Sequence, residues 1–232
     1  MQIQPIRCPL FKENGSLETY ISKIIPVLRN SDILVITSKI VALSQGRIVE
    51  NGPGRKSNVI REESEQVIKT KWCYLTLKDG HWCPNAGVDE SNARGKLILW
   101  PTDSYLVAAE MRKTLMKKFK LKKLGILITD SRTFPLRSGV TGVALGYAGF
   151  KGLRDYRGKR DLFKRKLIMT QTNVADSLAT AAVLLMGEGN ERQPLCLIKE
   201  APVVFTSMID RKELRIEAEE DMYRPMFESL EK

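Results

Sequence analysis

Histidine and paired cysteines are scarce in this 232-residue sequence. His81 is the only histidine, and Cys8, Cys73, Cys83 and Cys196 are far apart, with no C-x-x-C spacing. This pattern argues against a structural zinc site and against a fold built on disulfides. Unpaired cysteines are typical of a reducing compartment, so we expect a cytoplasmic protein.

Long apolar runs and the common catalytic motifs are also absent. No segment reaches the roughly 18 uncharged apolar residues of a membrane span, and the first 15 residues lack the apolar stretch of a secretory signal. The sequence contains no Walker A loop, G-x-G-x-x-G turn, G-x-S-x-G elbow or H-E-x-x-H helix. We therefore expect no export or membrane span, and chemistry that depends on carboxylates, hydroxyls and cations.

Positive charge is in excess, with 38 Lys and Arg against 27 Asp and Glu and a formal net charge of +11. The excess is concentrated in residues 112–123 and 151–166. Such a surface attracts phosphates, polycarboxylates or nucleic acid. A basic nucleic-acid-binding protein is thus one alternative, but aromatics are only 7% of residues and no known RNA-binding or DNA-binding motif occurs. We expect no nucleic-acid partner.

Hydrophobic periodicity predicts a mixed α/β fold, and 43% hydrophobic residues suffice for a sizeable core. A turn at 78–80 should join two strands, and the Gly-punctuated segment 140–147 indicates close backbone packing. With no repeat or clear linker, residues 1–232 should form a single unit of two interwoven lobes. We expect helices at 16–28, 62–70, 103–119 and 175–186, strands at 32–38, 72–77, 123–128, 167–170, 194–198 and 203–206, and a surface helix after residue 211.

Three segments join an acidic residue to glycine or small polar neighbours: NAGVDESN at 85–92, TDS at 129–131 and MGEGNE at 186–191. Hard cations such as Mg²⁺ and Mn²⁺ prefer oxygen ligands, and a phosphate substrate commonly completes their coordination. Asp89, Asp130 and Glu188 could hold a pair of metal ions against a nucleotide. Each could instead have an ordinary role, stabilising a loop, capping a turn or facing solvent beside a helix end.

Several motifs, in order along the chain, match one known family. They are ITSKIV at 36–41, NAGVDESN at 85–92, ITDS at 128–131, RSGVTGVALG at 137–146, DYRGKRDL at 155–162, NVAD at 173–176 and LLMGEG at 184–189. Through them the chain resembles the coenzyme F420:L-glutamate ligase family from near its first residues to Gly189. The resemblance implies a two-lobed α/β homodimer that uses GTP and two divalent ions, Mn²⁺ or Mg²⁺, to attach L-glutamate to an anionic acceptor.

The resemblance also implies roles for individual residues. The metal ligands would be Asp89, Asp130, Ser131 and Glu188. The nucleotide contacts would be Cys8, Pro9, Leu10, Phe11, Ser38, Lys39, Asn92, Met186, Gly187, Gly189, Asn190, Glu191, Arg192 and Gln193. Because guanidinium groups bind carboxylate and phosphate in bidentate fashion, Arg137, Arg154 and Arg157, with Lys159, would suit the acceptor or the glutamate. No residue is predicted as a catalytic acid or base.

Two departures from the family pattern bear on the substrates. Leu43 stands where the family has a nucleotide-contacting lysine, which leaves GTP and ATP both open. Arg132, Thr133 and Phe134 stand where the family often has x-G-R, and Phe134 could stack on a flat acceptor ring. The acceptor could thus be the deazaflavin coenzyme F420 or a folate, the latter in a folylpolyglutamate synthase-type reaction.

Overall fold

The structure is a computed structural model that describes residues 1–208 and 210–228, and it confirms the mixed α/β class. At its centre lies a five-stranded sheet with the order β1-β12-β2-β8-β9. Strands β2 and β8 are parallel, whereas the other neighbouring pairs are antiparallel. The bounds are β1 (Gln2–Ile6), β2 (Ile33–Thr37), β8 (Gly125–Arg132), β9 (Thr141–Ala148) and β12 (Leu195–Lys199).

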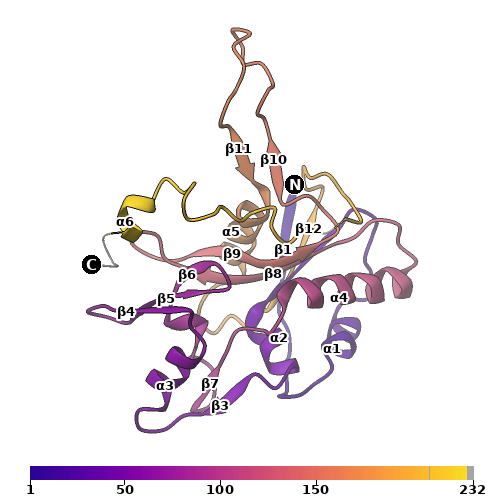
Figure 1. Ribbon diagram of the computed structural model, residues 1–232. Coiled ribbons are helices and arrows are strands. Elements are labelled where there is room, and N and C mark those ends of the chain that lie inside the picture. Colours follow the sequence, from indigo (N-terminus) through magenta and orange to yellow (C-terminus); the bar gives the residue numbers. More distant parts are fainter. Residues whose placement is uncertain (209, 229–232) are drawn as a thin grey trace.

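Helices cover both faces of this sheet (Figure 1). Side chains alternate along β2, so Leu34 and Ile36 join a core with helices α1, α2 and α4, whereas Ile33 and Val35 pack on the side of α5. A strand buried on both faces reads as a continuous apolar run, which explains the sequence of β2. The helices are α1 (Leu17–Ile24), α2 (Ser38–Ser44), α4 (Ser104–Phe119) and α5 (Val174–Met186).

A second group of elements, from residues 48 to 100, has its own small core around Val59, Ile60 and Leu97. One ladder pairs β3 (Ile48–Glu50) with β7 (Lys96–Ile98), and a three-stranded sheet contains β4 (Gln66–Lys69), β5 (Tyr74–Lys78) and β6 (His81–Pro84). Helix α3 (Arg55–Glu62) and the short η1 (Asn85–Gly87) complete the group. The division of the chain into two interwoven lobes stays a prediction.

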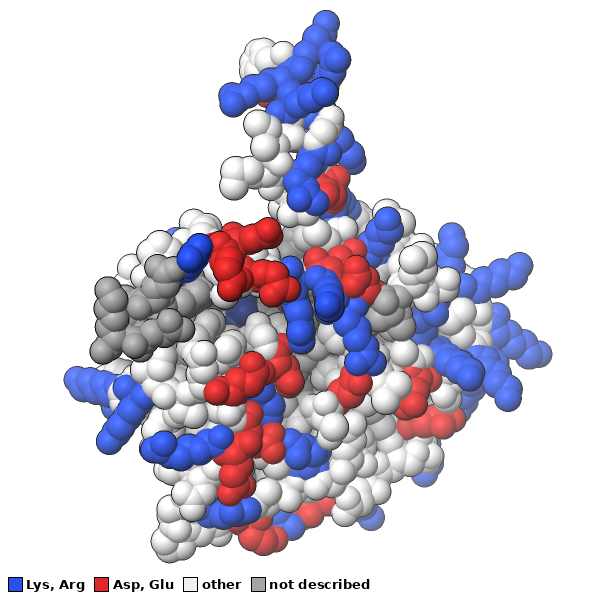
Figure 2. All heavy atoms as spheres, viewed as in Figure 1, with Lys and Arg blue, Asp and Glu red and all other residues white. Residues whose placement is uncertain are grey.

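A long hairpin projects from the body of the molecule (Figure 1). Strands β10 (Leu153–Asp155) and β11 (Gln171–Asn173) pair at its base, and residues 156–170 extend beyond them. Figure 2 shows that Lys and Arg side chains crowd this arm, which contains the basic run 151–166. Near the C-terminus lies α6 (Arg224–Glu228). None of the helices in residues 1–208 and 210–228 is long and apolar enough to cross a membrane.

Several local predictions are confirmed. The helices expected at 16–28 and 103–119 form as α1, which ends at Ile24, and α4. Ser16 and Asp103 cap them by accepting hydrogen bonds from the Thr19 and Leu106 backbone amides. The turn at 78–80 joins β5 to β6, and α5 ends at Gly187. Close packing of β9 is also confirmed, because a Cβ atom on Gly142 would lie 2.4 Å from a carbonyl oxygen of α5 and one on Gly146 would lie 2.5 Å from the α4 backbone.

Other predictions are wrong. The helix expected at 62–70 lies earlier, at α3, because Gly54 adopts a left-handed conformation (φ 72°) that starts the helix at Arg55, while residues 66–69 pair with β5. The strand expected at 167–170 is replaced by β11 at 171–173. Residues 203–206 form only an isolated bridge between Phe205 and Phe150, since β12 is already flanked by β1 and β2. Helix α2 was not anticipated.

Candidate functional site

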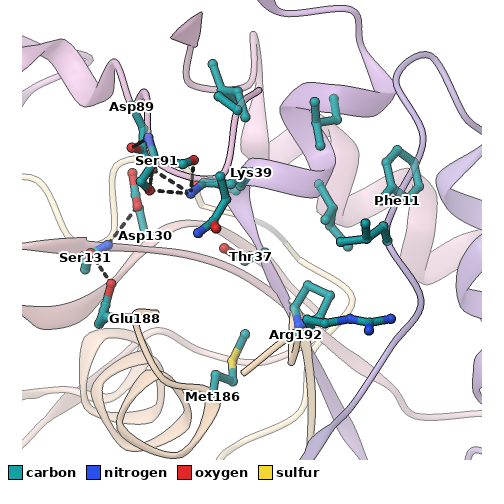
Figure 3. A pocket seen from close by; sticks show the side chains of 18 of the residues that line it. Phe11, Thr37, Lys39, Asp89, Ser91, Asp130, Ser131, Met186, Glu188 and Arg192 are labelled. Carbon is teal, nitrogen blue, oxygen red and sulfur yellow. Dashed lines mark hydrogen bonds and ion pairs between the residues drawn. The ribbon is translucent and has the colours of Figure 1, made fainter. Parts of the chain in front are cut away.

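A cavity of about 1160 Å³ opens where the two groups of elements meet (Figure 3). Its walls come from the loop after β1, the start of α2, residues 84–94, the end of β8 and the loop 186–193. All 14 residues predicted to contact the nucleotide line it, and so do the four predicted metal ligands. The fold therefore gathers these 18 residues from five separate segments, while their individual roles stay predictions.

Asp89 and Lys39 form an ion pair on one side of the cavity (Figure 3). The Lys39 ammonium lies 2.7 Å from Oδ2 of Asp89 and also donates to the carbonyl and hydroxyl oxygens of Ser91. The Ser91 amide and hydroxyl in turn donate to Asp89. Burial alone would raise the pKa of Asp89, but the hydrogen bonds and charge of Lys39, with the donors of Ser91, outweigh it and lower that pKa.

Asp130 lies beside Asp89, near the end of β8, and is followed by Ser131 and by Glu188, which comes just after α5 (Figure 3). Burial raises the pKa of Asp130 to about 6, against the stabilising hydrogen bonds from the Ser131 amide and the Trp100 indole. The Ser131 hydroxyl donates to Oε2 of Glu188 at 3.3 Å. Burial also raises the pKa of the Glu188 carboxyl. The surroundings of Asp130 and Glu188 therefore disfavour a negative charge on these carboxylates. A bound cation would stabilise that charge.

The side-chain oxygens of Asp89, Asp130, Ser131 and Glu188 suit Mg²⁺ when two of these residues bind each ion. In the part of the chain that the structure describes, no group of three or more His, Cys, Asp or Glu side chains could hold one ion together. Mg²⁺ commonly takes one or two carboxylates, with waters and substrate phosphates completing its octahedron. Asp89 with Asp130 on one side, and Ser131 with Glu188 on the other, supply such partial sets. This donor chemistry suits ions that are shared with a polyphosphate.

Hydrogen bonds link the predicted nucleotide contacts of segments that are far apart in the chain. The Cys8 amide donates to the Arg192 carbonyl at 2.8 Å, and Asn92 Nδ2 donates to the Gly189 carbonyl at 3.2 Å. The Phe11 ring meets Tyr20 edge-on, with centroids 4.9 Å apart. Burial raises the pKa of the Cys8 thiol, which keeps it neutral. Leu43 also lines the cavity, where the family pattern led us to expect a lysine.

The residues predicted for the acceptor or glutamate do not line this cavity. On the projecting arm, Arg157 pairs with Asp155 at 2.6 Å and Arg154 donates to the Pro202 carbonyl. Arg137 lies in the exposed loop between β8 and β9. The Phe134 ring covers the Arg132 guanidinium, whose central carbon lies 4.7 Å from the ring centroid. The structure leaves the acceptor roles of these residues as predictions.

Trp100 and Ser91 line the cavity but were not among the predicted site residues. The Trp100 indole donates to the carboxylate of Asp130, 30 residues away. Such a contact depends on the tertiary fold, so no local pattern announced it. Ser91 does lie inside the NAGVDESN motif, and its position two residues after Asp89 is the usual spacing for a serine that closes an Asx turn.

Known proteins resemble the chain over most of its length. A family model described as F420-0:Gamma-glutamyl ligase matches residues 51–200. The coenzyme F420:L-glutamate ligase of Methanococcus maripaludis (strain C7) is 34% identical, with 97% of each chain covered. The enzymes of the same name are 32% identical in Archaeoglobus fulgidus, with 93% of each chain covered, and 33% identical in Methanosarcina mazei, with 83% covered.

The motifs quoted above and the matched family model agree. The relatives are named as ligases, and the matched region contains Asp89, Asp130, Ser131 and Glu188. The chain is a ligase enzyme that belongs to the F420-0:gamma-glutamyl ligase family.

Proposed function

We propose that this enzyme joins L-glutamate to the carboxylate of a coenzyme F420 acceptor, using GTP or ATP and two divalent metal ions. The observation that carries the proposal is one cavity whose lining includes the carboxylates of Asp89, Asp130 and Glu188, the ammonium of Lys39 and the 186–193 loop. The names of the relatives give the glutamate and the coenzyme F420 acceptor. The carboxylates, cations and loop amides supply the chemistry that a nucleotide polyphosphate needs.

The cavity has complementary surfaces for the two ends of a nucleotide. Lys39 and Arg192 offer positive charge, and guanidinium and ammonium groups form strong charge-assisted hydrogen bonds with phosphate. The apolar side chains of Leu10, Phe11 and Leu43 form another part of the wall and suit a purine base. Such an arrangement aims the γ-phosphate at the carboxylate cluster.

The proposed reaction has two steps, phosphorylation of the acceptor carboxylate and attack by the glutamate amine. An oxygen of the acceptor carboxylate attacks the γ-phosphorus, the bond from phosphorus to the β,γ-bridging oxygen breaks, and the nucleoside diphosphate leaves with an acyl phosphate as the other product. The neutral glutamate amine then attacks the acyl carbon, the bond from that carbon to the phosphate oxygen breaks, and the amide forms as the departing inorganic phosphate takes the proton from the amine. Divalent ions, when bound by Asp89, Asp130, Ser131 and Glu188, supply charge neutralisation at the phosphates. Lys39, which is paired with Asp89, orients the phosphates beside these ligands.

Product mass spectrometry tests this proposal directly. The protein is incubated with labelled L-glutamate, Mn²⁺, GTP or ATP, and either the deazaflavin acceptor or tetrahydrofolate. A mass gain of one glutamyl unit on the deazaflavin, with equimolar release of phosphate, is the expected result. Glutamylation of the folate alone would replace the proposed acceptor with the folate alternative. No mass gain on either acceptor, with any nucleotide, would refute the ligase function.

We further propose that the enzyme works as a homodimer. The projecting arm exposes four large apolar side chains, each at least 75% accessible: Leu162 and Phe163 at its tip, and Ile168 and Met169 on the returning segment. Exposed apolar side chains of this size are typical of protein contacts. Light scattering on the purified protein should give twice the mass of one chain, and Leu162→Ser with Phe163→Ser should shift it toward the monomer. A monomeric wild type would refute the homodimer.

A further inference from the structure

We propose that Trp100 is a positioning residue that fixes the carboxylate of Asp130 for metal binding. The inference rests on the proposed function, because it assigns Asp130 to the metal site. Trp100 lies just beyond β7, in the other group of elements from β8, which carries Asp130. Its indole therefore links the two sides of the cavity at one of the proposed ligands.

Each oxygen of the Asp130 carboxylate has a hydrogen-bond donor. The Trp100 Nε1–H donates to Oδ2, and the Ser131 backbone amide donates to Oδ1 at 2.9 Å. Two donors on two oxygens fix both the plane and the rotation of a carboxylate. Each oxygen keeps a second lone pair, so the group can still ligate a cation. Hydrogen-bonding partners of this type orient metal ligands and tune their basicity.

The backbone around Trp100 makes room for this contact. A Cβ atom on Gly87 would lie 2.0 Å from the indole nitrogen, so only glycine at this position lets the ring reach Asp130. Gly87 also has a positive φ of 69°, which glycine adopts without strain. Gly87 is therefore required both for its positive φ and for the space that the Trp100 indole occupies.

A partly buried ionic network supports Trp100. Its carbonyl oxygen accepts a hydrogen bond from Arg47 Nε at 3.1 Å, and Arg47 Nη2 is 2.6 Å from Glu63 Oε2. Lys78 shares that Glu63 oxygen, and its ammonium lies 5.9 Å from the centroid of the Trp100 ring. His81 meets the ring edge-on at 6.2 Å. With only 5% of its surface exposed, the indole has little freedom to turn away from Asp130.

A plain packing role would need only the volume of the ring. Trp100→Phe keeps an aromatic ring and removes the N–H, and Trp72→Phe is a matched control because Trp72 is 86% exposed. We expect Trp100→Phe to weaken Mn²⁺ binding in the absence of nucleotide by about 10- to 100-fold, measured by calorimetry, and to lower kcat with a smaller change in the KM for nucleotide. Trp72→Phe should leave both unchanged. Wild-type Mn²⁺ affinity in folded Trp100→Phe would overturn the proposal.

A second measurement needs no metal and does not depend on a folded Trp100→Phe variant. In ¹⁵N-tryptophan-labelled, metal-free protein, the indole signal of Trp100 should shift in Asp130→Asn, while the Trp72 signal stays unchanged. The Trp100 signal is assigned by eliminating the signals that are lost in Trp72→Phe and Trp82→Phe. Added Mn²⁺ should broaden the Trp100 signal first. An unshifted signal in Asp130→Asn would overturn the Trp100 proposal. If the signal differs between the wild type and Asp130→Asn but the wild type binds no Mn²⁺, the proposed metal site is refuted, and with it the role of Trp100 in metal binding.

Discussion

The ammonium of Lys39 lies 2.7 Å from the carboxylate of Asp89, and this pair joins the first turn of α2 to the loop after η1. Three acceptors in residues 89–91 surround the three N–H bonds of Lys39. The same lysine therefore sets the position of a proposed metal ligand and faces the cavity in which we place the phosphates.

Removing that cation should separate nucleotide binding from metal binding. We expect Lys39→Met to raise the dissociation constant for GTP or ATP about tenfold or more, because a charge-assisted hydrogen bond contributes about 1.5–3 kcal/mol. Mn²⁺ affinity without nucleotide should rise, because Lys39 repels the ion and pairs with the proposed ligand Asp89. Lys56→Met is the control, because Lys56 pairs with Glu90 at 2.9 Å outside the cavity. Calorimetry measures both constants, and an unchanged nucleotide constant in Lys39→Met contradicts this assignment.

The loop after α5 depends on a glycine that no other residue can replace. Gly187 has φ 81° and ψ 167°, and a Cβ there would lie 2.3 Å from the Glu191 carboxyl carbon. The Glu191 carboxylate accepts a hydrogen bond from the Gly189 amide, so the clash would disturb the whole turn. We expect Gly187→Ala to lower the unfolding free energy by about 1–3 kcal/mol and to weaken nucleotide binding.

Gly54→Ala isolates the effect of backbone strain alone. Gly54 also has positive φ (72°), but a Cβ atom there would meet no other atom within 4 Å, and the residue starts α3 away from the cavity. Thermal unfolding should show a smaller loss in this variant, and nucleotide affinity should match the wild type. Equal nucleotide affinity in Gly187→Ala and Gly54→Ala would mean that the 186–193 loop does not contact the nucleotide.

The sequence predicted elements whose signals are local. Helix α4 carries its own cap at Asp103, and β2 is a compact apolar run between polar residues. Helix α2 has no side-chain cap, starts directly after β2 and is only seven residues long, so the sequence does not show a helical period there. The three-residue strands β3, β7, β10 and β11 are too short for periodicity to reveal them.

The sequence predicted those parts of the candidate site that lie in recognisable motifs. The four proposed metal ligands and six of the 14 proposed nucleotide contacts lie in the family motifs, and the fold brings all 18 residues to one cavity. The contacts of Trp100 with Asp130 and of Lys39 with Asp89 join residues 30 and 50 positions apart, so they required the tertiary structure. The acceptor arginines were chosen by charge and Phe134 by its aromatic ring, and neither property specifies where a side chain points.

The pKa of Asp130, raised by burial to about 6, predicts how the stability of the metal-free protein depends on pH. An unfolded aspartate titrates near 4, so the folded protein holds this proton more tightly and protonation favours folding. The stabilising effect is complete below about pH 4 and is lost as the pH rises to about 6. Asp130→Asn has no such loss, so its melting temperature relative to the wild type should rise between pH 4 and 6.5 in EDTA.

Asp89→Asn provides the contrast, because the pKa of Asp89 is lowered. A lowered carboxyl pKa stabilises the fold above about pH 4, and that stabilisation is lost only at more acidic pH. Asp89→Asn should therefore be less stable than the wild type by a constant amount between pH 4 and 6.5. If the Asp130→Asn difference is also constant over this range, Asp130 does not have the raised pKa.

Acceptor choice should depend on the residues that follow Ser131. Phe134 is 41% exposed and lies against the Arg132 guanidinium, so this corner of β8 presents a ring and a covered cation. Glycine and arginine at 133 and 134 would open space and add a cation that can pair with an acceptor phosphate. We expect Thr133→Gly with Phe134→Arg to raise kcat/KM for the deazaflavin relative to tetrahydrofolate, measured by competition with both acceptors.

Added charge alone must be separated from this local change. Leu136→Arg places a cation in the same loop, at a fully exposed position, without removing the Phe134 ring. It should raise kcat/KM for both acceptors by similar factors, because general attraction does not distinguish two anions. Phe134→Ala should reduce the use of a flat pterin ring, since an aromatic stack is worth about 0.5–1.5 kcal/mol, or about 2- to 13-fold. If the double variant and Leu136→Arg give the same acceptor ratio, the ring at position 134 has no part in selection, because charge then accounts for the whole effect.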